Sequence, residues 1–393
     1  MSLPSLHTID WNSDDVVFLR VDFNVPLENG IITDDTRITA ALPTIQYLLE
    51  KGCTVVIGSH LGRPNGEPNP KYTLKPIAKH LSTLLETEVI FVDQCIGNTV
   101  QAAIENRGQS KVILLENLRY EAGEEKNNPG FSKALASLAN AYVNDAFGVL
   151  HRAHSSVCGA AALFSKKAVG FLIQTEYDAL RKLYDEKPMM AVLGGAKVSD
   201  KIVLIESLID NCTDIFIGGA MAYTFLRAKE IPVGISRVES DRLELAKDLC
   251  RLAELKNVQI HLPIDHVTIS EFSETAETEI HETIPAERMG VDIGPQTIAA
   301  YTQKLAEAKS IFWNGPMGVF EWKSCAQGTK SIAQALVDLD GYAVVGGGDS
   351  AAATQQFGFA SSIDHVSTGG GASLAFLEGD VLPGVQVFME KGV

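Results

Sequence analysis

Short apolar runs rich in β-branched residues alternate with segments of helical periodicity along the whole of this chain. The alternation is typical of repeated βα units, in which helices cover both faces of a parallel sheet. Strands buried on both faces are continuously apolar, as these runs are. The pattern predicts an α/β protein, and a length of 393 residues exceeds one ordinary core, which favours two domains, or at most three.

The expected strands form two series, one in each half of the chain. They lie near Val16–Val21, Thr54–Gly58, Val89–Val92, Val112–Leu115 and Tyr142–Asn144, and then near Met190–Leu193, Asp214–Ile217, Val258–Leu262, Ser310–Trp313 and Tyr342–Val345. Between the series, Gln174–Glu186 is polar and compatible with a helix, which Pro188 ends because proline disfavours the helical conformation of the residue before it.

We therefore expect two doubly wound, Rossmann-like parallel sheets joined by a hinge helix, with a cleft between the domains. The expected boundaries are an N-terminal domain at 1–173, a hinge at 174–188 and a C-terminal domain at 189–375. The remaining segment, 376–393, is expected to pack back toward the N-terminal domain.

Composition disfavours several classes of protein. A formal net charge of −16 and a pI near 5.0 argue against general binding of nucleic acid. We find no signal-peptide pattern at the start and no apolar stretch approaching the roughly 20 residues that span a bilayer. The six cysteines are scattered without a metal-ligand spacing, so we interpret them as buried thiols. We expect a cytoplasmic protein with no membrane or nucleic-acid partner.

Arginines and histidines gather in the first half, in loops that follow predicted strands. The carboxyl ends of parallel strands share one sheet edge, where α/β folds bind ligands. Arginine matches phosphate or carboxylate oxygens with a planar fork. Any one of these arginines could instead pair locally, as Arg119 could with Glu116 or Glu121. Their joint placement beside Asp22 and Asn24 favours one small, multiply anionic ligand. The basic residues are Arg37, His60, Arg63, Arg119, His151, Arg152 and His154.

Glycine-rich turns that follow a strand and open a helix recur in the second half. Without a Cβ atom the backbone can approach a phosphate closely, and a helix N-terminus favours its charge. This context predicts a nucleotide-phosphate site, although both the Walker A sequence and the G-x-G-x-x-G fingerprint are missing. The turns are Gly194–Lys201, Gly218–Gly219, Asn314–Gly318, Gly346–Ser350 and Gly369–Ser373.

Two charged residues in these turns have two interpretations each. Asp349 could cap its helix or bind Mg²⁺ that accompanies a nucleoside phosphate, and the residues alone favour neither. Lys201 lies early in a predicted helix, where a cation opposes the helix dipole unless an anion is near. Asp200 or a transferring phosphoryl group could be that anion.

Together and in this order, the motifs resemble those of the phosphoglycerate kinase family from Val16 to the C-terminal segment. They are Val21–Pro26, Ser59–Pro64, Glu116–Arg119, His151–Ser156, Gly194–Lys201, Trp313–Glu321 and Gly346–Asp349. The resemblance implies a glycolytic and gluconeogenic phosphotransferase. Its reaction would be reversible transfer between 1,3-bisphosphoglycerate and ADP, giving 3-phosphoglycerate and ATP, with Mg²⁺ as cofactor, in a monomer that closes about its hinge.

The resemblance also implies roles for individual residues. The phosphoglycerate would be bound by Asp22, Phe23, Asn24, Arg37, His60, Leu61, Gly62, Arg63, Arg119, Arg152 and His154. The nucleotide would be bound by Gly195, Lys197, Lys201, Gly218, Gly219, Gly290, Asn314, Pro316, Glu321, Gly347, Gly348, Asp349 and Ser350, with Asp349 at the metal. Catalysis on the transferring phosphate would involve Arg37, Lys201, Gly347 and Gly370.

Two other functions compete with this interpretation. A non-catalytic sensor of phosphometabolites would keep a two-domain clamp, but retention of both Arg37 and Lys201 argues against it. A nucleotide-sugar transferase would explain the glycines but not the phosphate-suited side chains of the first half. The acceptor carboxylate is already a nucleophile, so we assign no general base. Assaying 3-phosphoglycerate with Mg-ATP separates the three functions.

Overall fold

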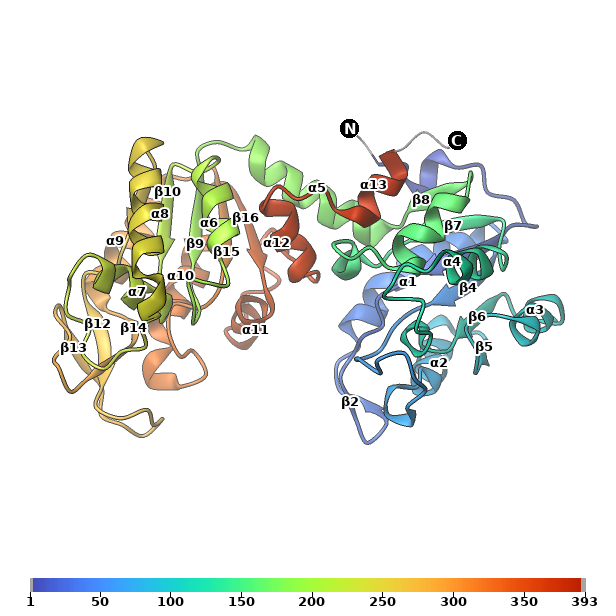
Figure 1. The fold of residues 1–393 in the computed structure, drawn as a ribbon, viewed down its shortest axis with the longest axis horizontal. Helices are drawn as coiled ribbons and strands as arrows, with labels where there is room; N and C mark the ends of the chain where they lie inside the picture. Colours follow the sequence, from blue (N-terminus) through green and yellow to red (C-terminus); the bar gives the residue numbers. More distant parts are fainter. Residues whose placement is uncertain (1–2, 390–393) are drawn as a thin grey trace. The chain divides into compact units, whose positions relative to one another are not determined.

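The computed structural model describes residues 3–389 and contains two six-stranded parallel sheets with helices around them (Figure 1). This confirms the predicted α/β class. The chain divides into two compact units, one formed by residues up to Tyr177 together with those from Val381 onward, the other by Asp178–Asp380. The ends of the expected domains, residues 1–2 and 390–393, lie outside the described residues.

The sheet of the first unit has the strand order β5-β6-β4-β1-β7-β8. Its strands are β1 (Val16–Arg20), β4 (Thr54–Gly58), β5 (Val89–Val92), β6 (Val112–Leu115), β7 (Ala141–Asn144) and β8 (Lys167–Val169). The edge strand β8 was not predicted, because it has three residues and begins with lysine. Strands β4, β5 and β6 lie on one side of β1, and β7 and β8 lie on the other. The direction of the strand order therefore reverses beside β1, and ligands bind at such a reversal in open α/β sheets.

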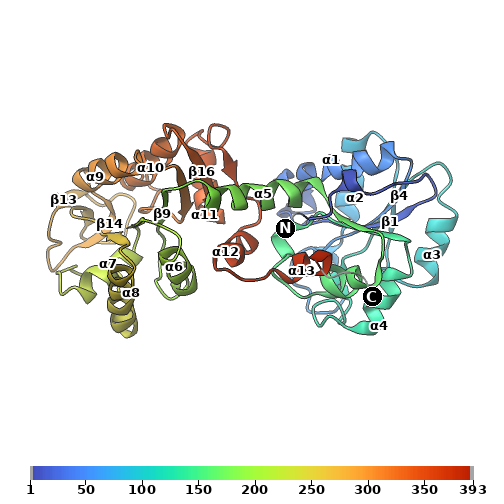
Figure 2. The same cartoon turned by 90° about the horizontal axis from the view of Figure 1, so that it is seen from above.

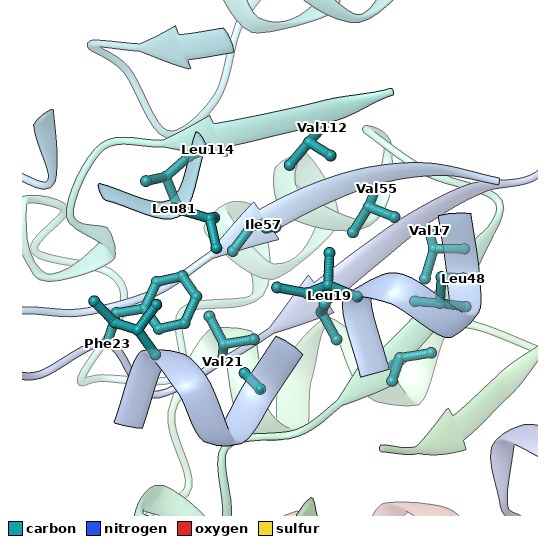
Figure 3. Packing of buried hydrophobic residues seen from close by; sticks show 14 of the residues in the cluster. Val17, Leu19, Val21, Phe23, Leu48, Val55, Ile57, Leu81, Val112 and Leu114 are labelled. Atoms are coloured by element: carbon teal, nitrogen blue, oxygen red, sulfur yellow. The ribbon is translucent and has the colours of Figure 1, made fainter. Parts of the chain in front are cut away.

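Helices cover both faces of this sheet and form its core. The helices are α1 (Thr36–Glu50), α2 (Lys75–Leu85), α3 (Asn98–Glu105) and α4 (Pro129–Ala136). Alternate residues of the central strands, such as Leu19 and Ile57, pack with Leu48 of α1 and Leu81 of α2 in one buried cluster (Figure 3). The period of two follows from the pleat of the strands.

The C-terminal helix α13 (Pro383–Met389) belongs to the first unit. The N–H of Gly384 donates to the carbonyl of Leu150 at 2.9 Å, and the Phe388 ring lies 6.3 Å from that of Tyr142 on β7. The boundary with the second unit falls after Asp380, five residues beyond the start expected for the C-terminal segment. Helix α5 (Phe171–Asp185) carries the other boundary and begins before the expected hinge.

The sheet of the second unit has the order β11-β10-β9-β15-β16-β17. Its strands are β9 (Met189–Leu193), β10 (Asp214–Ile217), β11 (Gln259–His261), β15 (Ser310–Asn314), β16 (Tyr342–Gly346) and β17 (His365–Val366). Figure 2 shows α9 (Pro295–Leu305) and α10 (Gln327–Val337) on one side of this sheet and α6 (Ile202–Ile209) and α8 (Leu243–Leu255) on the other. The remaining helices are α7 (Met221–Ala228), α11 (Gly348–Gln356) and α12 (Gly371–Leu377).

Several smaller elements were not predicted. An antiparallel sheet joins β12 (His266–Ile269), β13 (Glu279–His281) and β14 (Met289–Ile293), and a hairpin joins β2 (Leu27–Glu28) to β3 (Ile31–Ile32). Their polar, interrupted sequences lack the apolar runs that marked the main strands. All six cysteines are free and five of them are buried, which agrees with the interpretation as buried thiols. None of the helices in residues 3–389 combines the length and apolar character of a bilayer-crossing segment.

Candidate active site

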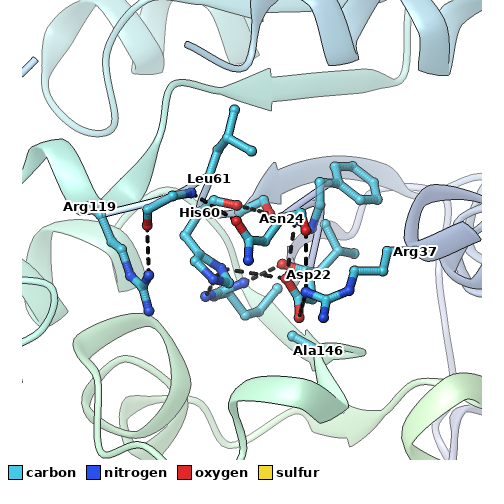
Figure 4. Close-up of polar contacts among 12 residues, drawn as sticks. Asp22, Asn24, Arg37, His60, Leu61, Arg119 and Ala146 are labelled. Carbon is cyan, nitrogen blue, oxygen red and sulfur yellow. Dashed lines mark hydrogen bonds and ion pairs between the residues drawn. The ribbon is translucent and has the colours of Figure 1, made fainter. Parts of the chain in front are cut away.

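Loops at the carboxyl ends of neighbouring strands bring much of the predicted basic set together in the first unit (Figure 4). Asp22 and Asn24 follow β1, and His60 follows β4. The Asn24 side-chain oxygen accepts the N–H of Gly62 at 2.8 Å, which joins these two loops. Arg37 Nη1, from the first turn of α1, donates to Asp22 Oδ2 at 3.0 Å and to the Asn24 carbonyl at 3.3 Å.

Arg119, after β6, is buried and held by two contacts. Its Nη1 donates to the Gly62 carbonyl at 2.8 Å, and its Nε lies 3.2 Å from Glu125 Oε1. The ion-pair partner is therefore Glu125, whereas the sequence suggested Glu116 or Glu121. Glu116 is engaged elsewhere, since it accepts the N–H of Leu74 at 2.8 Å. Arg119 thus reaches the same Gly62 loop that Asn24 binds.

The other two predicted phosphate ligands make fewer contacts. Arg63 is exposed, and Arg152 is half-buried with its Nε donating to His151 Nε2 at 3.2 Å. No ion pair is recorded for either within residues 3–389. Their guanidinium groups therefore have donors left for an anion.

The histidines of the site are held in their neutral form. Burial, followed by Arg20, Arg119, Arg37 and His154, keeps the pKa of His60 well below its ordinary value. Burial and then the arginines lower the pKa of His154 to about 3. At neutral pH these rings can donate or accept hydrogen bonds but add no charge to the site.

Arg20 and Glu124 near this site had no predicted role, and Ser156 was included only as part of the His151–Ser156 motif. Arg20 is fully buried, and its Nε donates to Ser156 Oγ at 2.8 Å. The same hydroxyl donates to Glu124 Oε1 at 2.5 Å. A signal was present, because Arg20 is the one charged residue in the apolar run of β1, and a buried charge must be paired.

In the second unit, three glycine turns pack backbone against backbone. The N–H of Gly195 donates to the Pro316 carbonyl at 3.0 Å, and that of Gly219 to the Met317 carbonyl at 2.9 Å. A Cβ atom on Gly194 would lie 2.0 Å from the Pro316 carbonyl oxygen, and one on Gly219 would lie 2.5 Å from the Gly195 nitrogen. Glycine is required here by close packing, and the N–H groups of Gly195 and Gly219 are already used within the protein.

Lys201 joins the first of these turns to the loop after β15. Its Nζ donates to the Asn314 carbonyl at 2.8 Å and also to the Asn314 side-chain oxygen. Burial lowers the pKa of Lys201 to about 8, although Asp349 and Asp200 act to raise it. Helix α6 begins at Ile202, so Lys201 is the N-cap residue rather than a residue inside the helix.

The turn after β16 adjoins this cluster. Asn314 Nδ2 donates to the Gly346 carbonyl at 2.8 Å, and Ser350 Oγ accepts the N–H of Gly315 at 2.5 Å. Gly347 has φ of +92° at the N-cap of α11, and a Cβ there would lie 2.5 Å from Asn314 Nδ2, so glycine is needed. The turn exposes Gly348 and Asp349 at the first turn of α11.

Asp349 does not cap α11. Gly347 holds the N-cap position, and within residues 3–389 no hydrogen bond is recorded for the Asp349 carboxylate. The same part of the chain contains no group of three His, Cys, Asp or Glu side chains suited to a metal. An exposed, unengaged carboxylate fits Mg²⁺ that takes most of its oxygens from phosphates.

The remaining predicted nucleotide ligands belong to several elements of the second unit. Gly290, on β14, faces α7, since a Cβ there would lie 2.1 Å from the Tyr223 hydroxyl. The N–H of Gly218 donates to the Leu193 carbonyl at 2.8 Å, while Lys197 and Glu321 are exposed. Gly370 is the N-cap residue of α12.

One residue near the Lys197 turn was missed. The Glu239 carboxylate accepts the N–H groups of Val198 at 2.6 Å and Ser199 at 3.1 Å. It also accepts the Ser199 hydroxyl at 2.6 Å, so it fixes the turn that carries Lys197. Glu239 lies 38 residues beyond Lys201 in a polar segment, and nothing in its local sequence points to this turn.

Comparisons with known proteins agree over nearly the whole chain. A family model described as phosphoglycerate kinase matches residues 7–380. The phosphoglycerate kinase of Anaeromyxobacter sp. (strain Fw109-5) is 52% identical over 378 residues, which cover 94% of this chain and 96% of the relative. That of Clostridium botulinum (strain Eklund 17B / Type B) is 48% identical over 374 residues, 94% of each.

Solved structures agree as well. The phosphoglycerate kinase of Coxiella burnetii superposes with a TM-score of 0.91 at 38% identity and covers 100% of both chains. That of Pyrococcus horikoshii OT3 has a TM-score of 0.82 at 33% identity and covers 99% of this chain and 100% of its own.

Proposed function

This chain belongs to the phosphoglycerate kinase family and catalyses reversible phosphoryl transfer between 1,3-bisphosphoglycerate and ADP, and we propose that its first unit binds the phosphoglycerate and its second the nucleotide. The reaction serves glycolysis. The observation that supports this division is the grouping of Asp22, Arg37, His60 and Arg119 at one sheet edge, while Lys201, Asn314 and Asp349 gather at another.

The first unit would hold the phosphoglycerate at both ends. Arg63, Arg119 and Arg152 would bind the remote phosphate, because guanidinium groups match its oxygens bidentately. Asp22 would accept a hydrogen bond from the substrate hydroxyl group, and the Asn24 side-chain NH2 would donate one to the hydroxyl oxygen. Arg37 would act on the reacting carboxyl group, and the backbones at Phe23, Leu61 and Gly62 would complete the substrate site.

The second unit would hold the nucleotide. The turns at Gly347, Gly348 and Gly370 would offer backbone N–H groups, and Lys197 and Lys201 would contact phosphate oxygens. The nucleoside would lie against Gly195, Gly218, Gly219, Gly290, Asn314, Pro316 and Glu321, with Ser350 behind the phosphate turn. Asp349 would hold Mg²⁺, which when bound neutralises charge on the nucleotide phosphates.

For transfer of the phosphoryl group, the protein must position the two substrates and neutralise charge on the equatorial phosphate oxygens. Arg37 and Lys201 would supply positive charge there, and Lys201 with a pKa of about 8 is mostly protonated at neutral pH. The carboxylate attacks directly, so no side chain has to remove a proton. Because the two substrates must meet, we propose that the units close about residues 174–188 and expel water that would hydrolyse the acyl phosphate. We propose a cytoplasmic monomer.

A coupled assay with 3-phosphoglycerate and Mg-ATP tests the proposal. Arg37→Ala and Lys201→Ala should each abolish most turnover while the purified chain stays folded. Arg251→Ala and Lys256→Ala remove exposed cations of the same kinds and should leave turnover unchanged. Binding of both ligands by the wild-type chain without turnover would support the sensor instead. Turnover that survives both substitutions would refute the roles given to Arg37 and Lys201.

A further inference from the structure

Arg20 ends β1 as a fully buried guanidinium that contacts His60 of the substrate site. Each of its three nitrogens has a partner. Nε donates to Ser156 Oγ at 2.8 Å, Nη1 donates to the Val21 carbonyl, and Nη2 lies 3.3 Å from His60 Nδ1. A side chain without solvent access does not touch a substrate, so any effect of Arg20 on the reaction passes through its partners.

A buried carboxylate balances this charge. Glu124, also fully buried, accepts the Ser156 hydroxyl at 2.5 Å and the Ser156 N–H at 2.9 Å. Ser156 Oγ therefore accepts from Arg20 and donates to Glu124, which links the two charges through one hydroxyl. A buried charge is tolerated when it is paired and hydrogen-bonded, and here each nitrogen of Arg20 and each carboxylate oxygen of Glu124 has a partner. The pair also fixes the direction in which the guanidinium points.

The contact with His60 has a defined direction. A guanidinium has donors only, so His60 Nδ1 must accept through its lone pair. A neutral imidazole with a lone pair on Nδ1 carries its proton on Nε2. The Asp22 carboxylate lies 3.7 Å from Nδ1, too far to take a proton from that nitrogen. Within residues 3–389 no partner is recorded for Nε2, so its N–H remains available to a ligand.

We propose that Arg20 is a positioning residue that acts through His60, holding the ring in its neutral Nε2–H tautomer so that it donates one hydrogen bond to an oxygen of the phosphoglycerate. The identity of the ligand rests on the proposed function. The opposite tautomer would turn a lone pair toward an anion, which is repulsive. Burial is the main factor that opposes protonation of the ring. The charges of Arg20, Arg119 and Arg37 oppose it further, and the Asp22 carboxylate, 3.7 Å from Nδ1, favours it.

The tautomer can be measured directly in the full-length wild-type chain. Imidazole ¹⁵N spectra at pH 7, without ligand, should show a protonated Nε2 and an unprotonated Nδ1 for His60. A His60→Asn spectrum assigns the signals, and exposed His7 supplies an internal reference. A protonated Nδ1, or a doubly protonated ring, would overturn the proposal. Addition of 3-phosphoglycerate should shift the Nε2 signal.

The response of the Nε2 signal to 3-phosphoglycerate separates the failure of this proposal from the failure of the proposed function. If His60 is the Nε2–H tautomer but its signals do not shift when 3-phosphoglycerate is added, the hydrogen bond from His60 to that ligand is refuted. The proposed placement of the substrate is refuted with it. If His60 of the unliganded wild-type chain is not in the Nε2–H form, the role of Arg20 alone is refuted. Neither result bears on whether the wild-type chain catalyses the reaction.

Variants test the role of Arg20 in catalysis. Arg20→Met keeps much of the side-chain volume but removes the donors, so His60 should populate both tautomers and the KM for 3-phosphoglycerate should rise about 10-fold. The KM for ATP should stay within about twofold, and Arg20→Lys, which keeps a donor, should restore part of the loss. Equal changes in both KM values would indicate general damage and contradict the proposal.

Arg20→Met leaves Glu124 unpaired and could unfold the first unit. Ser156→Ala keeps the guanidinium and removes only one of its anchors, so it provides a second test. It should give a smaller fraction of the wrong His60 tautomer and a smaller rise in the KM for 3-phosphoglycerate. An unchanged tautomer together with an unchanged KM in a folded Ser156→Ala protein would refute the part that Ser156 plays in orienting Arg20.

Discussion

The guanidinium of Arg37 lies 3.0 Å from the Asp22 carboxylate, and 38% of the Arg37 side chain is exposed to solvent. The residue is thus anchored at one nitrogen while the rest of the fork stays accessible. Asp22 also lies 3.7 Å from His60 Nδ1. The same carboxylate therefore contacts the group proposed to act on the reacting carboxyl and a ring proposed to bind the substrate.

Arg37→Ala should lower kcat for phosphoryl transfer by about 100-fold or more, the usual loss when one charge-stabilising donor is removed. Because we propose that the nucleotide binds to the other unit, the Kd for Mg-ATP should change by less than about twofold. Steady-state kinetics and calorimetry measure the two quantities. Equal losses in turnover and nucleotide binding would show that Arg37 does not act on the transition state.

Asp349→Ala should weaken binding of Mg-ADP but leave binding of metal-free ADP unchanged or slightly improved, since one negative charge is lost near the phosphates. Stability should not fall, because the carboxylate accepts no hydrogen bond within residues 3–389. Titration calorimetry with and without Mg²⁺ and a thermal melt give the three values. Asp340→Ala, at another exposed aspartate, is the control. A lower Tm with unchanged Mg-ADP affinity would favour the helix-cap interpretation.

Lys201 should set an alkaline limit on activity. Burial lowers its pKa to about 8, so the free enzyme loses this positive charge as the pH rises through that value. The kcat/KM for ATP, which reports the free enzyme, should fall about tenfold per pH unit above it. Lys201→Arg cannot lose its proton in this range, so its profile should stay flat there. A wild-type profile that remains flat to pH 10 would exclude this role for Lys201.

Asp145 ties the end of β7 to the helix that leads out of the first unit. Its Oδ1 accepts the N–H groups of Leu172 at 2.9 Å and Ile173 at 3.2 Å, in the first turn of α5. Burial raises the pKa of Asp145 to about 7. The folded chain therefore holds this proton more tightly than the unfolded chain, whose aspartates titrate near ~4.

The stabilisation that the protonated Asp145 gives the folded chain is complete below the pKa of this residue in the unfolded chain. It is lost as the pH rises through about 7. Relative to Asp145→Asn, which cannot ionise, the wild-type first unit should lose about 1.4 kcal/mol per pH unit across that window. Urea titrations at pH 5, 6 and 7, with unfolding monitored by hydrogen exchange of the β1 and β7 amides, measure this loss of stability. Parallel pH dependences for the two proteins would contradict the assignment.

Much of the architecture follows from sequence periodicity alone. All ten predicted strands exist, because strands buried on both faces must be continuously apolar, and this signal survives in a single sequence. The placement of Asp22, His60 and Arg119 at one edge follows from the parallel topology, since they lie in the loops that follow the neighbouring strands β1, β4 and β6. The edge strands β8 and β17 were missed because two or three residues carry no period.

The partners of individual side chains could not be predicted, whether they lie near in the sequence or far apart. Arg119 pairs with Glu125 rather than with Glu116, because the turn after β6 directs Glu116 toward Leu74. Likewise, Glu239 reaches Ser199 only through the packing of the loops around α7. The sequence marked the glycines but not the reason for them, since at Gly195 and Gly219 the N–H groups bind protein carbonyls.

A crystal structure of the chain with 3-phosphoglycerate and Mg-ADP bound tests the division of the site most directly. The remote phosphate is expected on Arg63, Arg119 and Arg152, and the carboxylate beside Arg37. The ADP phosphates are expected at Lys201 and the Gly347 turn, with the metal on Asp349. A phosphoglycerate phosphate bound by Arg37, or a nucleotide bound by the arginines of the first unit, would contradict it.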